Sequence, residues 1–155
     1  MKPDLYALYQ KLSPLPGGKR IFSRSICLFA PYFGTIKPTV MHLEPGLSRW
    51  SMPKRRAVHN HIGTVHAIAV CNLCELCAGT MIDATLPTTH RWIPKGMDVQ
   101  YLSKANTDLI GTATLDIPTW PTDEGMNTPV QVTVLDTNGK TVVTAQINMW
   151  VTPKH

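Results

Sequence analysis

Residues 60–83 read NHIGTVHAIAVCNLCELCAGTMID, and from Val65 to Ile82 this run is apolar on every side of a helix. A helix of that kind belongs inside a protein, so we expect a central helix wrapped by the rest of the chain. The run is too short to span a bilayer, and it carries Glu75 at its middle. A carboxylate there is costly to desolvate unless it is paired, which makes Glu75 a candidate for acid–base chemistry.

Length and charge limit the classes of protein to consider. The chain has 155 residues, of which 43% are hydrophobic, as expected for one globular domain with a proper core. Its formal net charge of +5 fits an anionic partner. The sequence has no basic run interleaved with aromatic residues, so we expect no nucleic acid as partner.

The four cysteines are Cys27, Cys71, Cys74 and Cys77. Three of them share the expected buried helix, where they cannot build a disulfide framework, so a reducing compartment is expected. Their spacing does not present thiolates as a tetrahedral metal site, and small core residues are the better interpretation. Because the N-terminus has no continuous apolar region of the kind found in signal peptides, we predict a cytoplasmic protein. Separately, we expect no membrane partner, no metal and no bound cofactor.

The segments around the central run predict short helices followed by antiparallel strands. Residues 3–12 and 19–30 have the pattern of helices, and residues 36–43 and 47–52 predict a hairpin around Pro45 and Gly46. After the helix, strands are expected at residues 90–93, 99–104, 109–116, 130–134 and 143–151. Asn138-Gly139 marks a hairpin between the last two strands. One antiparallel sheet curled around one helix satisfies all these faces, which predicts an α+β fold.

The run also resembles a known family. The pattern Asn60-x-x-Gly63-Thr64-x-His66, followed by Leu73-Cys74-Glu75, is similar to hotdog-fold acyl-CoA thioesterases of the phenylacetate-degradation type, which have N-x-x-G-T-x-H-G-G and then L-A-D. The later segment 101–113 resembles that family's next strand elements. The resemblance covers roughly residues 35–151. It implies a hotdog domain at residues 34–155, preceded by a helical extension at residues 1–33.

The family's functional residues carry over position by position. The resemblance implies that Glu75 is the general base or nucleophile, and that the backbone amide of Ala67 polarises the thioester carbonyl. Asn60 would orient water or the substrate, which is implied to be an acyl-CoA or an acyl-carrier thioester. The chain departs from the family at Ala67-Ile68, where the family has Gly-Gly. The amide survives that change, but the bulk of Ile68 narrows the approach.

Spacing adds an argument about assembly. Ala67 lies in the first turn of the expected helix, and Glu75 is eight residues further, roughly 12 Å along the axis at about 1.5 Å per residue. One thioester carbon cannot touch both groups within one chain. A second, antiparallel copy of the helix would bring one subunit's amide to the other's Glu75, so we expect a homodimer, or a dimer of dimers, with a shared site.

Further residues are candidates for substrate binding. Around the thioester these are His61, Gly63, Thr64, His66 and Ile68, although a structural role near the helix N-terminus is also expected for His66. Lys54-Arg55-Arg56 and Lys104 could hold the phosphates of coenzyme A, or be solvated charges.

Two alternatives to the thioesterase stay open. His61 stands fourteen residues before Glu75, as in hotdog dehydratases that act on 3-hydroxyacyl thioesters. Those enzymes carry a Pro-Gly turn ahead of the helix, where this chain has Gly63-Thr64. The departure at Ala67-Ile68 also leaves room for an acyl-binding hotdog protein without turnover.

Overall fold

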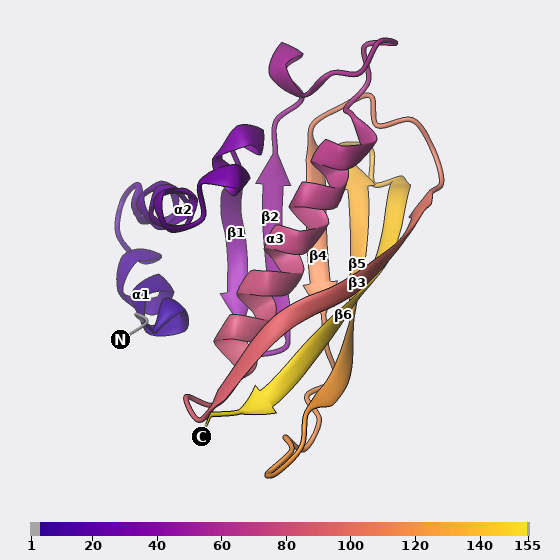
Figure 1. Ribbon diagram of the computed structural model, residues 1–155. Coiled ribbons are helices and arrows are strands. Elements are labelled where there is room, and N and C mark those ends of the chain that lie inside the picture. The colour runs from indigo at the N-terminus through magenta and orange to yellow at the C-terminus, as the bar shows by residue number, and fades with distance from the viewer. Residues whose placement is uncertain (1–3, 155) are drawn as a thin grey trace.

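Helix α3 (Ala67–Thr85) lies in the concave face of a six-stranded antiparallel sheet, as Figure 1 shows. The computed structural model describes residues 4–154. In chain order the strands are β1 (Thr39–Glu44), β2 (Leu47–Met52), β3 (His90–Tyr101), β4 (Leu109–Thr114), β5 (Met126–Asp136) and β6 (Thr141–Pro153). Their order in the sheet is β1-β2-β4-β5-β6-β3, so β1 and β3 form the two edges. The predicted sheet wrapped around one central helix is confirmed.

The ends of α3 follow from its local sequence. His66 is the N-cap, and its ring Nδ1 accepts a hydrogen bond from the amide of Ile68 at 3.1 Å. The C-cap Leu86 is extended, as expected for a residue that precedes a proline. Small residues bring the sheet close to the helix. A Cβ added to Gly111 of β4 would lie 2.8 Å from the Sγ of Cys77.

Most of α3 is buried in the core, yet its length alone does not exclude a membrane. The helix has 19 residues and is apolar enough to cross a bilayer, so the argument that the run is too short was wrong. Within its most apolar window, 67% is buried inside the fold. Most of the apolar surface of α3 is therefore covered by the sheet and the N-terminal helices.

Two of the predicted strands are a single strand. Residues 90–93 and 99–104 were expected to be separate, but β3 runs continuously from His90 to Tyr101 along β6. Its register shifts between Pro94 and Gly96. Proline cannot donate to a neighbouring strand, and it is tolerated here because β3 is at the edge of the sheet.

The two predicted hairpins are confirmed, with one boundary corrected. β1 begins at Thr39 rather than at residue 36, because Pro31–Ile36 forms a short 3-10 helix, η1. Between β5 and β6, Gly139 has a φ of +79°, which glycine adopts without strain. The carboxylate of Asp136 accepts the amides of Asn138 and Lys140, both at 2.9 Å, and so closes the turn.

The N-terminal helices share the core of the sheet. Helices α1 (Leu5–Leu12) and α2 (Gly18–Phe29) confirm the two predicted helices, although Pro3, the expected first residue, lies outside the described residues. The fully buried ring of Phe22 lies 5.3 Å from that of Tyr9 and 6.1 Å from that of Trp50, centroid to centroid. Figure 1 shows both helices beside β1 and α3. The predicted boundary between residues 33 and 34 stays a prediction.

Candidate active site

Glu75 lies on the one side of α3 that the fold leaves uncovered. Ile68 is 55% exposed, and Cys71 and Glu75 are half-buried, whereas nearly all residues between Asn72 and Ile82 are buried. Residues three and four apart share one helix face, so these three side chains form what we call the open face of α3. The expectation of a helix buried on every side, with a fully buried carboxylate, was wrong for a single chain.

Tyr101, at the end of β3, contacts this open face. Its hydroxyl lies 3.2 Å from the Sγ of Cys71. That hydrogen bond, together with burial, raises the pKa of Tyr101 to about 12. The phenol is therefore protonated at neutral pH and can keep the contact between β3 and α3. Sequence reasoning did not assign this pair to the site, although Cys71, one turn before Glu75, was a signal for it.

The backbone amide of Ala67, at the start of α3, has no hydrogen-bond acceptor in the described part of the chain. Ala67 is the first residue of the helix, which confirms its predicted place in the first turn. The first amides of a helix have no partner within it. The neighbouring Ile68 amide is capped by His66, whereas the Ala67 amide has no acceptor among residues 4–154. A helix N-terminus also carries a partial positive charge, so this amide can bind a developing anion.

Asn60 holds together the loop that precedes the helix. Its Oδ1 accepts the amides of Ile62 and Thr64, both at 3.1 Å, and its Nδ2 donates to the Oγ1 of Thr64 at 2.7 Å. Gly63 completes the loop with a φ of +77°. His61 is exposed near the tip of the loop. Asn60 thus fixes the conformation of the loop that leads into the N-terminus of α3.

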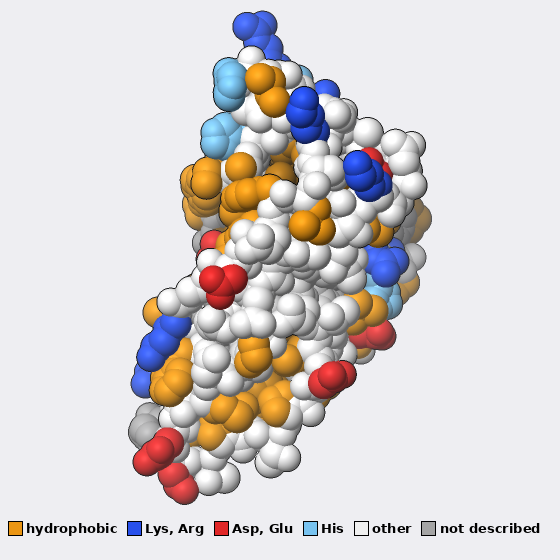
Figure 2. Space-filling view, turned by 90° about the vertical axis from the view of Figure 1, so that its right-hand side faces the viewer, with side chains coloured by type: hydrophobic (Ala, Val, Ile, Leu, Met, Phe, Trp, Pro, Cys, Tyr) orange, Lys and Arg blue, Asp and Glu red, His pale blue; other side chains and the backbone are white. Residues whose placement is uncertain are grey.

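The basic candidates gather at the N-terminal end of α3. The loop after β3 joins this end, because the amide of Val65 donates to the carbonyl of Ala105 at 2.9 Å. Arg56 and Lys104 are exposed, while the guanidinium of Arg55 donates to the carbonyl of Thr35. Figure 2 shows Lys, Arg and His side chains collected at its upper end, where the chain enters α3.

Asn72 connects the site to the N-terminal extension. Its Nδ2 donates to the carbonyl of Tyr32 at 3.2 Å and to the Oγ1 of Thr35 at 3.3 Å, both in η1. Its Oδ1 is buried without a hydrogen-bond partner in the described part of the chain. Asn72 is three residues from Glu75, on the adjacent strip of the helix surface. The sequence alone did not indicate this contact, because Asn72 and η1 are far apart in the chain.

Cys74 and Cys77, near the middle of α3, are buried core residues. Burial raises the pKa of Cys74 to about 12, and that of Cys77 well above its ordinary value. Both thiols are therefore neutral near pH 7, whereas metal ligation requires thiolates. Within residues 4–154 no three His, Cys, Asp or Glu side chains are arranged to hold a metal ion.

Comparison with solved structures gives the same fold. The chain is similar to a structural-genomics target, APC5556, with 43% sequence identity, coverage of 97% of this chain and 99% of that chain, and a TM-score of 0.84. It is also similar to a Pseudomonas aeruginosa protein of unknown function described as a probable thioesterase, with 23% identity, coverage of 90% and 97%, and a TM-score of 0.75.

A Haemophilus influenzae thioesterase is similar as well, with 11% identity, coverage of 79% and 82%, and a TM-score of 0.68. At such identities the last two likenesses bear on the fold alone, and they confirm the predicted hotdog fold and its structural resemblance to thioesterases. No curated protein matches the chain. The family described as a domain of unknown function, DUF4442, matches residues 18–151, and the chain therefore belongs to the DUF4442 family.

Proposed function

We propose that this protein is an acyl-CoA thioesterase whose site is shared between two subunits. The observation that carries the proposal is the position of Glu75 on the open face of α3, eight residues from an amide without an acceptor at the start of the same helix. Thioester hydrolysis needs a carboxylate to activate water or to attack, and a donor for the oxyanion. Similarity in fold to proteins described as thioesterases supports the same reaction.

Two features of the single chain support a dimer. β3 is an edge strand, so one side of its backbone is available to pair with another strand. Ile93 and Tyr101 on β3, together with Ile68 on α3, are exposed apolar side chains near that edge. A second copy packed antiparallel would cover them and place the Ala67 amide of one subunit near Glu75 of the other. A dimer of dimers stays open.

The proposed reaction follows from these two groups. Glu75 takes a proton from a water molecule as the water oxygen bonds to the thioester carbon. The Ala67 amide of the other subunit donates to the carbonyl oxygen, which becomes an oxyanion. When the intermediate collapses, the carbon–sulfur bond breaks, and the leaving thiolate takes the proton from Glu75. This sequence requires no metal and no cofactor.

The surroundings receive proposed roles in binding. Arg56 and Lys104, exposed near the helix N-terminus, would bind phosphates of coenzyme A with Lys54. Arg55 would contribute its positive charge while its guanidinium stays hydrogen-bonded to the carbonyl of Thr35 in η1. Asn60 would position the loop, and through it the water or the thioester.

The remaining loop residues complete the proposed site. His61, Gly63, Thr64 and His66 would border the thioester, and Ile68 would restrict its approach. The cytoplasmic location, and the expectation that neither nucleic acid nor membrane is a partner, stay predictions.

The test is hydrolysis of a panel of acyl-CoA thioesters, followed with a thiol-detecting reagent. Glu75→Gln keeps the volume of the side chain but removes the base, and it should lower kcat by about a hundred- to ten-thousand-fold. Glu44→Gln, a matched change on the exposed edge strand β1, should leave turnover unchanged. If folded Glu75→Gln turns over substrate at the wild-type rate, Glu75 has a structural role and not a catalytic one. If no acyl-CoA is hydrolysed but one raises the melting temperature, the protein binds acyl-CoA without turnover.

A further inference from the structure

The outer face of helix α2 exposes several large apolar side chains. Residues three and four apart share one helix face, so Ile21, Arg24 and Leu28 form one exposed row along α2. Phe29 at the end of the helix and Tyr32 in η1 continue this row. Leu28, Phe29 and Tyr32 are the three most exposed large hydrophobic side chains of the described residues, at 82%, 71% and 66%. We call these five residues the α2 surface, and neighbouring exposed apolar side chains of this kind mark an interaction site.

The same part of the chain carries the excess of positive charge. The protein has 15 Lys and Arg and 10 Asp and Glu; five of the basic residues and none of the acidic ones lie within residues 5–43, so the rest of the chain has ten of each. The five are all exposed, namely Lys11, Lys19, Arg20, Arg24 and Lys37. The formal net charge of +5 is therefore concentrated around the α2 surface, which indicates an anionic partner.

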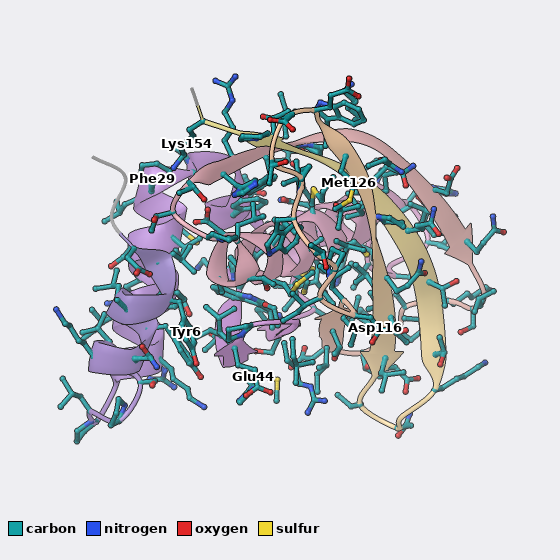
Figure 3. All side chains as sticks on the ribbon, turned by 90° about the horizontal axis from the view of Figure 1, so that it is seen from below. Tyr6, Phe29, Glu44, Asp116, Met126 and Lys154 are labelled. Carbon is teal, nitrogen blue, oxygen red and sulfur yellow. The ribbon has the colours of Figure 1, made fainter. Side chains whose placement is uncertain are left out.

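Helix α2 is held against the edge strand β1, so its outer face points away from the sheet. The Oγ of Ser23 accepts the amide of Val40 at 2.9 Å, and the Nζ of Lys19 donates to the carbonyl of Met41 at 2.6 Å. Figure 1 shows α1 and α2 outside β1 and α3, on the left of the molecule. Figure 3 shows the same two helices from below, with Phe29 labelled at the end of α2. The α2 surface is thus presented on a fixed helix at one side of the fold.

An apolar cavity adjoins the α2 surface. It has a volume of about 340 Å³ and lies between the N-terminal helices and the C-terminal half of α3. Phe29 lines it together with Leu5, Ile26 and Phe33. The hydroxyl of Thr80, which also lines the cavity, is bonded to the backbone of α3. The apolar surface at Phe29 therefore continues inward, in surroundings that suit hydrocarbon better than water.

The combination of charge and apolar side chains distinguishes between possible occupants. A second copy of the chain would bring two sets of Arg20 and Arg24 together, and like charges repel across an interface. An anionic bilayer instead offers negative headgroups above hydrocarbon. The long stems of Arg20 and Arg24 let their guanidinium groups stay at the headgroups while Leu28 enters the apolar boundary. Both features of the α2 surface are then satisfied at once.

We propose that the α2 surface binds anionic lipid membranes from one side, without crossing them. Leu28 and Phe29 enter the boundary between headgroups and acyl chains, and Arg20 and Arg24 contact lipid phosphates. This inference does not rest on the proposed thioesterase function. It departs from the sequence-based expectation of no membrane partner, because only packing decides which apolar side chains stay exposed.

The test is flotation of the full chain with vesicles of phosphatidylcholine alone, or of phosphatidylcholine with phosphatidylglycerol. Wild type should bind the vesicles that contain phosphatidylglycerol at least about tenfold more tightly than the neutral ones. High salt should weaken this binding, because it screens the attraction between the basic side chains and the phosphates. Equal binding to both kinds of vesicle, or binding to neither, would overturn the proposal.

Two variants with matched controls locate the contact. Leu28→Ser should lower the vesicle partition coefficient at least about tenfold, since a buried leucine side chain contributes at least that factor. Its control is Ile117→Ser, an exposed residue in the loop after β4, which should stay within about twofold of wild type. Arg24→Gln should lower the partition coefficient about fivefold. Its control is Lys140→Gln, an equal loss of charge in the β5–β6 turn, with little effect.

The controls decide what any loss of binding means. Equal losses in Arg24→Gln and Lys140→Gln would show that net charge alone holds the protein to the vesicle, and the α2 surface would then have no special role. If Leu28→Ser does not fold, Arg24→Gln decides. If wild type binds no vesicle and Leu28→Ser changes the mass in light scattering, the α2 surface is an interface between copies. Hydrolysis of butyryl-CoA without vesicles should not change in these variants, so either proposal can fail without the other.

Discussion

Ala67→Pro should remove the proposed oxyanion donor while leaving the fold intact. Ala67 is the first residue of α3, where proline is well tolerated because the amide there has no partner inside the helix. The preceding His66 already has φ −63° and ψ 136°, a conformation that suits a residue before proline. The substitution therefore deletes one N–H group and little else, and the melting temperature should change by only a few degrees.

Loss of a single oxyanion donor costs about a hundred- to a thousandfold in kcat, or about 2.7–4 kcal/mol. Thiol release at saturating acyl-CoA should show a fall of this size in Ala67→Pro. Ala67→Ser, which keeps the amide, should retain kcat within about tenfold, since only side-chain bulk changes. Wild-type kcat in folded Ala67→Pro would refute the role of this amide.

Mixing two inactive variants tests whether the site is shared. In a mixed dimer of Ala67→Pro and Glu75→Gln subunits, one of the two sites keeps both the amide and the carboxylate. After unfolding and refolding together, about half of the dimers are mixed, so activity should recover to about one quarter of wild type. A mixture that stays inactive, although dimers exchange, would place both groups in one subunit.

The remaining predictions concern the loop, the core and a buried thiol. Asn60→Ala should lower the rate of hydrolysis at least about tenfold, since the loop loses hydrogen bonds worth about 1 kcal/mol each. His61→Ala should lower that rate much less. If the protein instead dehydrates a 3-hydroxyacyl thioester, and His61→Ala abolishes that activity, the dehydratase is favoured. Gly111→Ala should destabilise the fold by about 1–3 kcal/mol in urea unfolding because its methyl group overpacks against α3, while Gly96→Ala, whose Cβ meets nothing closer than 3.9 Å, should cost less than about 1 kcal/mol. Burial raises the pKa of Cys77, so a thiol reagent at pH 8 should label it only after unfolding, and rapid labelling of the native protein would contradict its burial.

Local sequence patterns were enough to predict many of the helices and strands. Alternating apolar residues and Asn138-Gly139 were enough to predict the β5–β6 hairpin, because side chains alternate between the faces of a strand. The N-terminal boundary of α3 at Ala67 also agrees with the sequence. Errors arose where tertiary pairing overrides a local signal. Pro94 interrupts the pattern of β3, but an edge strand absorbs it as a bulge, so one strand was mistaken for two.

By itself, the sequence determined that α3 is a core helix with Glu75 at its middle and Ala67 in its first turn. These are properties of spacing along one chain, which a fixed helical rise converts into distance. Only the tertiary structure decided which side of α3 stays open, since a helix apolar all round has no periodicity that marks its uncovered face. The contact of Tyr101 with Cys71, the bonds of Asn72 to η1, and the cavity between the N-terminal helices and the C-terminal half of α3 join segments far apart in the chain, and packing alone brings them together.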